Sequence, residues 1–403
     1  MILLVVKTPE EATEVIQGIY EVKRTQAERV KISGCQGRVL SYDVVSDEFV
    51  PGFDRTTVDG FAVIASDTFG CSESIPAVLT LSGEILMGEA AGGAIKPGSC
   101  VAVSTGGDLP ERADAVVMVE HTEEYGDGLI GILRPAAPGN NIIFKGDDVS
   151  PGDIVLKGGT TLTAHDIGIL SALGCCEVDV MRKPVVGVIS TGDELVAPLQ
   201  RPGRGQVRDV NTPMLVTLVE QYGAVAINMG IVRDEADALR DSVMRAVREC
   251  DAVLISGGSS AGVRDMTARV IESAGELLFH GIAIKPGKPT ILGIIDDKPI
   301  YGLPGHPVAA YFVTELFVRP LISGIMGAVV RRKTTSAQIS EAISSNHGRA
   351  EYMAVTLDKS GSAQPIRGKS GLIASLSGSD GYICIPRDSE GMPAGAEVEV
   401  TYW

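Results

Sequence analysis

The sequence of 403 residues predicts a multidomain fold of the α/β plus β class. We expect a doubly wound parallel α/β domain, with β-rich N-terminal domains before it and a C-terminal β-barrel-like domain after it. Three observations predict this fold. The length corresponds to two to four domains of roughly 100–200 residues each. Apolar strands alternate with helical segments in the middle of the chain, and Pro-Gly turns precede strands on both sides of it.

The N-terminal part is predicted to begin with a helix. In Thr8-Pro9-Glu10-Glu11, the threonine can cap the helix, the proline suits its first position and the second glutamate completes a capping box. This helix should run to about Tyr20, and a second helix is expected over 163–173. We assign 1–26 and 149–181 to one linker domain with helical character.

Pro-Gly turns mark the β-rich parts of the chain. They occur at Pro97-Gly98, at Pro151-Gly152 and, as a variant, at Pro393-Ala394-Gly395, each before an apolar strand, as in small β-barrels. We therefore expect a β-rich domain over 27–148 and a C-terminal β domain over 328–403.

The middle of the chain, 182–327, has the pattern of βαβ units. Each apolar strand is followed by a predicted helix, which is typical of a parallel sheet covered on both faces. Such a sheet binds ligands beyond the carboxyl ends of its strands. The predicted strands that matter most for a site are 184–192, 224–233 and 252–257.

Composition excludes several classes of protein. The formal net charge is −16, and almost all of the excess acid lies in residues 1–181, so we expect neither a nucleic-acid nor a membrane partner. No stretch of about 18 apolar residues is present, which predicts no membrane span. The seven cysteines are scattered and form no C-x-x-C, so we expect neither a disulfide framework nor a zinc site. Free cysteines fit a reducing compartment, so we expect a cytoplasmic location.

Polar residues follow three predicted strands of the α/β domain and should meet at one edge of the sheet. The carboxylates Glu194, Asp234 and Asp265 would repel one another there unless a cation such as Mg²⁺ neutralised them. Asp234 is interpreted equally well as a helix cap. A Gly-rich loop that contains Ser259 and Ser260 follows the third strand and could bind an anion.

Two later loops could also bind an anion. Lys285 and Lys288 lie in a proline-stiffened turn, where cations suit phosphate contact. The segment 301–308 links a strand to a helix, and Pro307 suits the first helical position, which favours an anion at that helix start. His306 is expected to be an exposed loop histidine rather than a metal ligand or an acid–base group.

Six motifs occur in one order along the chain. They are T-V-D-G-F-A-V, S-T-G-G-D-L-P followed by A-D-A-V-V-M-V-E, I-S-T-G-D-E-L, G-G-S-S-A-G, I-K-P-G-K-P and G-L-P-G-H-P-V. In this combination the chain resembles the molybdopterin molybdenumtransferase family, which includes the E domain of gephyrin. The resemblance implies that adenylylated molybdopterin and molybdate react, assisted by Mg²⁺, to give molybdenum cofactor and AMP. It also implies a homodimer, whose active site pairs the α/β domain of one subunit with the first-half β domain of the other.

The resemblance also implies site residues, and the Gly-rich loop adds Ser259 and Ser260. The expected catalytic residues are Asp59, Thr105, Glu194 and Asp265. The expected substrate-binding residues are Asp148, Thr191, Asp234, Ser259, Ser260, Lys285, Lys288, Pro304, Pro307, Arg349 and Ser370. The expected metal ligands are Glu194, Asp234 and Asp265.

Three departures from the family pattern bear on function. Gly257–Gly262 reads G-G-S-S-A-G in place of G-G-V-S-V-G, and His306 stands in place of an asparagine. Val210-Asn211-Thr212 stands in place of D-S-N, which weakens a role for a carboxylate there. Two alternatives stay open: insertion of tungstate, whose size and charge are nearly those of molybdate, and a pterin-binding scaffold without turnover.

Overall fold

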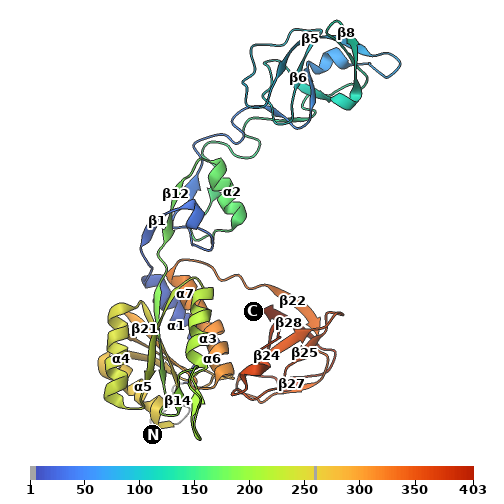
Figure 1. The fold of residues 1–403 in the computed structure, drawn as a ribbon. Helices are drawn as coiled ribbons and strands as arrows, with labels where there is room; N and C mark the ends of the chain where they lie inside the picture. The colour runs from blue at the N-terminus through green and yellow to red at the C-terminus, as the bar shows by residue number, and fades with distance from the viewer. Residues whose placement is uncertain (1–5, 258–260) are drawn as a thin grey trace. The chain divides into compact units, whose positions relative to one another are not determined.

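A computed structural model describes residues 6–257 and 261–403, and for 261–265 it describes the backbone alone. The chain divides into two compact units, coloured by residue number in Figure 1. The first unit comprises Met1–Tyr42, Gly159–Thr163 and Glu177–Trp403, and the second comprises Asp43–Gly158 and Ala164–Cys176. Each unit is described by itself below.

A six-stranded sheet forms the centre of the α/β domain in the first unit. Its order is β16 (Val225–Val232), β13 (Val185–Thr191), β17 (Ala252–Gly257), β21 (Lys298–Leu303), β20 (Ile291–Ile295) and β18 (Glu276–His280). The first four strands are parallel, as predicted, but β20 is antiparallel to both of its neighbours. The reason is the two-residue turn Asp296-Asp297, where both residues have positive φ. Such a turn joins antiparallel strands only.

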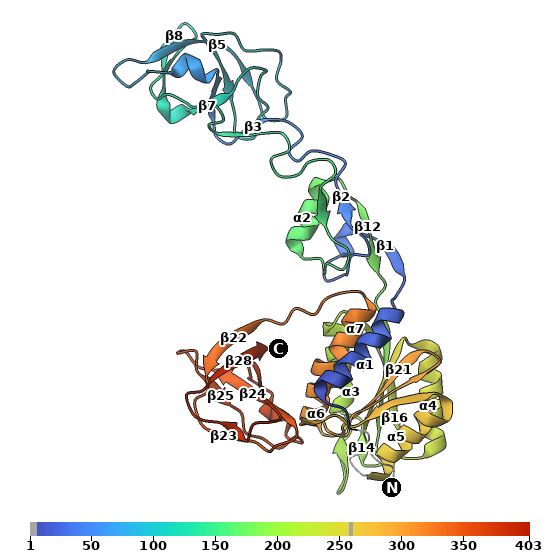
Figure 2. The ribbon, with the colours of Figure 1, turned by 180° about the vertical axis from the view of Figure 1, so that it is seen from behind.

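Helices cover both faces of this sheet, which confirms the doubly wound prediction (Figure 2). The apolar faces of α4 (Ala236–Glu249) and α5 (Ala261–Ala274) share a core with Ile189 and Val253. On the other face, α3 (Asn211–Gln221) and the helical run from Pro307 to Ile325 share a core with Val188 and Leu254. The short parallel pair β14 (Leu195–Val196) and β15 (Val207–Arg208) follows β13.

The first helix, α1 (Pro9–Val22), differs from its predicted place. Its capping box is present, because Thr8 N–H donates to Glu11 Oε2 (2.8 Å) and Glu11 N–H donates to Thr8 Oγ1 (3.2 Å). However, its apolar residues Ile16 and Ile19 are buried in the α/β core, so 1–26 does not form a linker domain with 149–181.

Strand β1 (Ala27–Lys31) does not follow the expected boundary at residue 27 between the linker domain and the β-rich domain. It pairs with β12 (Glu177–Met181) instead of joining the β-rich domain, and a short 3₁₀ turn, η1 (Ile32–Gly34), follows it. The boundary was misplaced because strand pairing over such a long sequence separation leaves no local pattern.

The second unit is β-rich, as predicted. Its main sheet has the order β7 (Ala115–Met118), β4 (Gly60–Val63), β6 (Ser99–Val103), β5 (Ala77–Ile85), β9 (Leu129–Ile132) and β8 (Thr122–Gly126). Two short antiparallel pairs accompany it: β3 (Arg55–Thr56) with β10 (Ile142–Ile143), and β2 (Val44–Val45) with β11 (Ile154–Leu156). Its helical elements are α2 (Ala164–Ala172), η2 (Ala65–Thr68) and η3 (Val119–His121).

The C-terminal domain is built from strands, as predicted. Its sheet has the order β19 (Ile284–Lys285), β24 (Ala350–Leu357), β26 (Gly381–Ile385), β28 (Glu397–Tyr402) and β22 (Thr334–Gln338), and β25 (Ala363–Pro365) also pairs with β24. The pair β23 (Ile343–Ser344) and β27 (Gly391–Met392) and the turn η5 (Ile373–Ser375) complete it. Strand β19 comes from the sequence of the α/β domain, so this sheet crosses the expected boundary at residue 328.

One helical run in the described part of the chain is long and apolar enough to cross a membrane, judged by length and composition alone. It consists of α6 (Pro307–Val313), the π-helical turn η4 (Thr314–Val318) and α7 (Arg319–Ile325). Within this run, 78% of an 18-residue window is buried inside the fold, and its residues pack in the main core beside β21. Burial inside the protein explains its hydropathy, since a core helix has the same composition.

A cluster of aromatic side chains joins α6 to the C-terminal domain. The ring of Trp403 lies 4.9 Å from that of Tyr311 and 5.1 Å from that of Tyr382, measured between centroids. Phe312 and Tyr352 complete the cluster. Edge-to-face contacts of this kind stabilise a junction beyond the apolar area that they bury. The C-terminal half of α6 is therefore held next to β24.

Candidate active site

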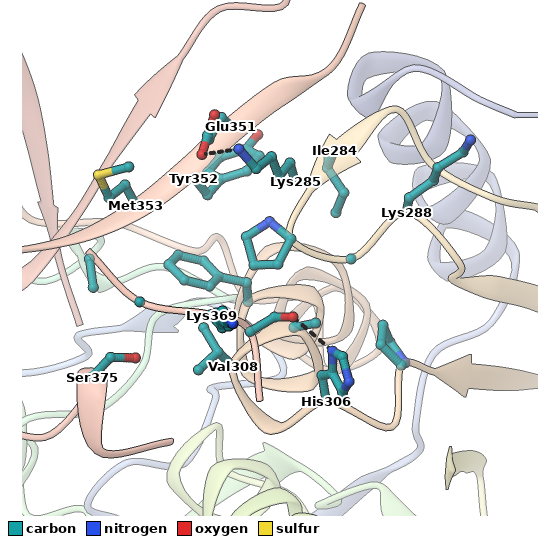
Figure 3. Close-up of a pocket in the computed structure, with 18 of the residues that line it drawn as sticks. Ile284, Lys285, Lys288, His306, Val308, Glu351, Tyr352, Met353, Lys369 and Ser375 are labelled. Carbon is teal, nitrogen blue, oxygen red and sulfur yellow. Dashed lines mark hydrogen bonds and ion pairs between the residues drawn. The ribbon is translucent and has the colours of Figure 1, made fainter. Parts of the chain in front are cut away.

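A cavity of about 720 Å³ lies at the start of α6. Its walls come from the β19 loop, the loop before α6, strand β24 and the segment 366–376 (Figure 3). The charged residues in its lining are Lys285, Lys288, Arg349, Glu351 and Lys369. Four cations against one carboxylate make the cavity suitable for an anion.

The two predicted lysines differ in their surroundings. Lys285 Nζ lies 2.8 Å from Glu351 Oε1, whereas Lys288 extends in the opposite direction in Figure 3. Glu351 is only 6% exposed, and its Oε2 accepts a hydrogen bond from Ser345 Oγ (2.7 Å). The charge of Lys285 is thus partly neutralised by Glu351, a residue that the sequence analysis did not consider. The sequence alone gave no signal for Glu351, because its pairing with Lys285 depends on the contact between β19 and β24.

The first turn of α6 holds one edge of the cavity in place. Pro307 occupies the first helical position, as predicted, and His306 is the N-cap residue. Val308 N–H donates to the backbone oxygen of Ser370 (3.1 Å), and His306 Nδ1 lies 2.8 Å from Ser370 Oγ. His306 is exposed, as expected. The structure therefore brings Ser370 to the helix start.

A second cavity, of about 300 Å³, lies at the carboxyl ends of β13 and β17. Its lining includes Thr191, Glu194 and Pro307, and it shares Gly305 and His306 with the larger cavity. The structure thus gathers predicted residues around two adjoining cavities. The larger is lined by Lys285, Lys288, Pro304, Arg349 and Ser370, and the smaller by Thr191, Glu194 and Pro307.

The sequence analysis left open whether Asp234 caps a helix or belongs to the site, and its position excludes the helix cap. The N-cap residue of α4 is Glu235, so the interpretation of Asp234 as a helix cap is wrong. Its Oδ1 instead accepts a hydrogen bond from Thr191 Oγ1 (2.7 Å), and its backbone N–H donates to Asp193 Oδ1 (3.3 Å). Asp234 is therefore tied to the end of β13, where Thr191 and Glu194 lie.

The exposed carboxylate of Glu194 folds back over a glycine. A Cβ atom at Gly192 would lie 2.7 Å from Glu194 Oε2, so any larger residue at this position would displace the carboxylate. In the ion pairs formed by the described side chains, neither Glu194 nor Asp234 has a cationic partner. Both can therefore offer oxygen atoms to a ligand.

The predicted magnesium site consists of three carboxylates, and the structure describes the side chains of two of them, Glu194 and Asp234. Among the described residues, no group of three or more His, Cys, Asp and Glu side chains could hold a metal ion. Asp265 lies in α5, but its side chain is outside the description, and Ser259 and Ser260 lie outside the described residues. Glu194 and Asp234 fit Mg²⁺ by the chemistry of their oxygen donors alone.

One polar residue near this site was not identified from the sequence. Asp209, one residue before the segment compared with D-S-N, supplies a carboxylate that is only 5% exposed. It accepts hydrogen bonds from Thr212 N–H (3.0 Å) and Ser190 Oγ (3.1 Å). A buried carboxylate therefore lies directly before Val210-Asn211-Thr212, where the sequence analysis had weakened a role for one.

Asn211 connects the sheet to the loop before α6. Its Nδ2 donates to Ser256 Oγ (2.8 Å) and to the backbone oxygen of Gly305 (2.9 Å). Its Oδ1 is buried, and no described group donates a hydrogen bond to it. Asn211 also lines the smaller cavity, so its two Nδ2 hydrogen bonds tie the wall of that cavity to the end of β17 and to the loop before α6.

The remaining predicted residues lie in the second unit. Asp59 Oδ1 accepts hydrogen bonds from the backbone N–H (2.7 Å) and the Oγ1 (2.9 Å) of Thr105. These two bonds, that of the backbone first, lower the pKa of the Asp59 carboxyl below its usual value. Asp148 is exposed, and its backbone N–H donates to the oxygen of Val50 (3.0 Å). The structure therefore brings Asp59 and Thr105 together.

Comparison with known proteins covers most of the chain. Residues 7–174 match the family model "MoeA N-terminal region (domain I and II)", 187–324 match "Probable molybdopterin binding domain", and 336–403 match "MoeA C-terminal region (domain IV)". A solved structure of the molybdopterin biosynthesis moeA protein from Pyrococcus horikoshii OT3 has 34% sequence identity to this chain and a TM-score of 0.87. The match covers 99% of this chain and all of that one.

Two enzymes named molybdopterin molybdenumtransferase are similar in sequence. The Bacillus subtilis protein is 31% identical, over 98% of this chain and 94% of its own length. The Haemophilus influenzae protein is 36% identical, over 75% of this chain and 74% of its own length. Because these similarities extend through all three regions of the chain, the protein belongs to the molybdopterin molybdenumtransferase (MoeA) family.

Proposed function

We propose that this protein is a transferase that inserts molybdate into adenylylated molybdopterin, releasing AMP and giving molybdenum cofactor. The observation that carries the proposal is the pair of adjoining cavities that share Gly305 and His306. The larger gathers cations and suits the oxyanion and phosphate groups, and the smaller lies beside the strand-end carboxylates. Membership of the family supports the same reaction.

In this proposal the larger cavity binds the anions. Lys288, Arg349 and Lys369 supply positive charge, and Ser370 supplies a hydroxyl at the edge of the cavity. Lys285 contributes to the extent that its pairing with Glu351 leaves charge available. Because molybdate and phosphate are dianionic near neutral pH, contacts with charged donors would contribute more than neutral hydrogen bonds.

The strand-end residues act at the phosphate that is cleaved. Glu194 and Asp234, together with Asp265, would hold Mg²⁺, which supplies positive charge to phosphate oxygens when it is bound. Thr191 holds the Asp234 carboxylate in place through its hydroxyl. Asn211 holds the loop at Gly305, which both cavities share, through its Nδ2.

The second unit takes part through a homodimer. We infer that Asp59, Thr105 and Asp148 act in the active site of a second copy, with the Thr105 bonds keeping the Asp59 carboxyl ionised. The inference is supported by the position of these three residues, which lie in a different unit from the residues that line the two cavities. The reaction takes place in the cytoplasm. A sedimentation coefficient of a monomer at micromolar concentration would contradict the dimer.

The direct test is to incubate the protein with adenylylated molybdopterin, Mg²⁺ and either molybdate or tungstate, and to measure AMP release. Release that depends on molybdate supports the proposed reaction. Release that depends on tungstate but not on molybdate would indicate the tungstate enzyme instead. Tight binding of the pterin nucleotide without release of AMP would indicate a binding or scaffold protein.

A further inference from the structure

His306 lies where the two cavities meet. It lines both of them, and it stands at the N-cap of the helical run that begins with Pro307. Its imidazole Nδ1 is 2.8 Å from Ser370 Oγ, and the backbone of the same serine accepts a hydrogen bond from Val308 N–H. Figure 3 shows this contact as a dashed line from the His306 ring. The side chain thus joins α6 to the segment 366–376.

We propose that His306 is a positioning residue that couples oxyanion binding in the larger cavity to the uptake of one proton. The inference rests on the proposed function only in that the larger cavity binds an oxyanion. It adds that the affinity for the oxyanion rises as the pH falls through the range in which histidine titrates.

The hydrogen bond to Ser370 gives the coupling its geometry. When Nδ1 carries no proton, the Ser370 hydroxyl donates its hydrogen to the imidazole and presents only its oxygen to the cavity. When the ring is protonated, Nδ1–H donates to Ser370 Oγ instead. The hydroxyl hydrogen is then free to point at an anion, and the histidine itself adds a positive charge.

The charges around His306 give the coupling its sign. Titratable and charged groups line the two cavities together with His306: Lys285, Lys288, Arg349, Glu351 and Lys369 in the larger, and Glu194, Arg208 and Asp209 in the smaller. Glu351 is paired with Lys285, so the larger cavity has an excess of positive charge.

A bound oxyanion reverses this balance. Its negative charges neutralise Lys288, Arg349 and Lys369 and favour the imidazolium next to them. Binding therefore raises the affinity of His306 for a proton, and by reciprocity the proton raises the affinity for the anion. The acidic groups of the smaller cavity are present with and without the anion and do not change the sign of this linkage.

The test is calorimetric titration of the full-length protein with molybdate from about pH 6 to about pH 8. Each titration is made in two buffers with different ionisation enthalpies, so that protons taken up on binding are counted. The variants are His306→Asn, which keeps a polar side chain without the titration, and the control His165→Asn. His165 is an exposed histidine on α2, in the other unit.

We expect the wild type and His165→Asn to bind molybdate roughly fivefold or more tightly at the acidic end, with net proton uptake. His306→Asn should show a flat profile without uptake. The same pH profile in His306→Asn and wild type would overturn the role of His306 and leave the anion site intact. Absence of molybdate binding by the wild type at every pH would overturn the anion site itself. Circular dichroism checks folding, and His306→Gln replaces His306→Asn if that variant does not fold.

Discussion

The hydroxyl of Thr191 donates a hydrogen bond of 2.7 Å to Asp234 Oδ1 and so links the ends of two neighbouring parallel strands, β13 and β16. Asp234 does not cap the following helix, so this bond is what orients its carboxylate. The Thr191 hydroxyl, at the end of a buried strand, therefore positions the Asp234 carboxylate.

Replacing Thr191 with valine keeps the shape of the side chain and removes this bond. A hydrogen bond to a charged group contributes about 1.5–3 kcal/mol, so we expect AMP release to slow about tenfold or more. Single-turnover measurements give the rate. The matched control is Thr217→Val, because the Thr217 hydroxyl donates only to the backbone oxygen of Pro213 in its own helix. Equal rates in the two variants would contradict a role for Thr191.

Removing the charge of Glu351 should strengthen anion binding. In Glu351→Gln the ion pair with Lys285 is lost, and the lysine becomes free to face the cavity. We expect the Kd for molybdate to fall about threefold or more, because one more cation is unpaired next to the anion. Isothermal titration calorimetry measures the Kd. The control Glu341→Gln breaks an exposed ion pair with Arg367 and should leave the Kd unchanged.

Tyr222 and Glu315 form a buried pair beneath the helical run. Tyr222 O–H donates to Glu315 Oε2 (2.7 Å), and Arg319 Nη1 lies 2.6 Å from Glu315 Oε1. Burial, and then the negative charge of Glu315, raise the pKa of Tyr222 far above its usual value, so the phenol stays a donor at physiological pH.

Tyr222→Phe should lower the free energy of unfolding by about 1–3 kcal/mol, because it leaves one oxygen of a buried carboxylate without its donor. Urea unfolding followed by circular dichroism measures the change. The control is Tyr42→Phe, at an exposed position, for which we expect a change within about 0.5 kcal/mol. A similar small change for Tyr222→Phe would show that Arg319 alone satisfies Glu315.

The pKa of Asp59 depends on Thr105. Both hydrogen bonds from Thr105 favour the carboxylate, so its folded-state pKa is lower than its unfolded value. The stabilisation from these bonds is present above the unfolded pKa and is lost as the pH falls through the folded one. Thr105→Ala removes the hydroxyl bond and should raise the pKa of Asp59 towards its ordinary value. Carbon-13 NMR of the Asp59 carboxyl follows the titration, and an unchanged pKa would contradict the contribution of the hydroxyl.

Local features of the sequence were sufficient to predict much of the fold. The capping box at Thr8–Glu11 and the apolar run before Gly192 each specify their element within a few residues, and the structure confirms both. The turn at Asp296-Asp297 was just as local, but it was not recognised as a hairpin, so the antiparallel strand β20 was not predicted. That error came from the strength of the βαβ pattern around it.

Contacts between distant residues could not be predicted in the same way. Lys285 and Glu351 meet because β19 adds to a sheet of the C-terminal domain, and His306 meets Ser370 because the segment 366–376 folds over α6. No periodicity encodes such pairings, since they depend on how whole elements pack. The sequence therefore predicted candidate site residues, several of which line the two cavities, but not which of their charges are already paired.

Different roles for Glu194 and Lys288 give the sharpest test of the site. We predict that Glu194→Ala abolishes AMP release in a single turnover and leaves pterin nucleotide binding largely intact, because loss of a transition-state contact lowers the rate of the chemical step. Asp265→Ala should behave in the same way. Lys288→Ala should mainly weaken nucleotide binding, because a cation in the larger cavity contacts phosphate in the ground and transition states alike.

The competing explanation is that Glu194 only stabilises the turn after β13, where its carboxylate covers Gly192. Its loss would then lower the free energy of unfolding by about 1 kcal/mol and leave turnover unchanged. Thermal melting and single-turnover AMP release, measured on the same preparations, separate the two explanations. If folded Glu194→Ala protein releases AMP at the wild-type rate, Glu194 has no catalytic role.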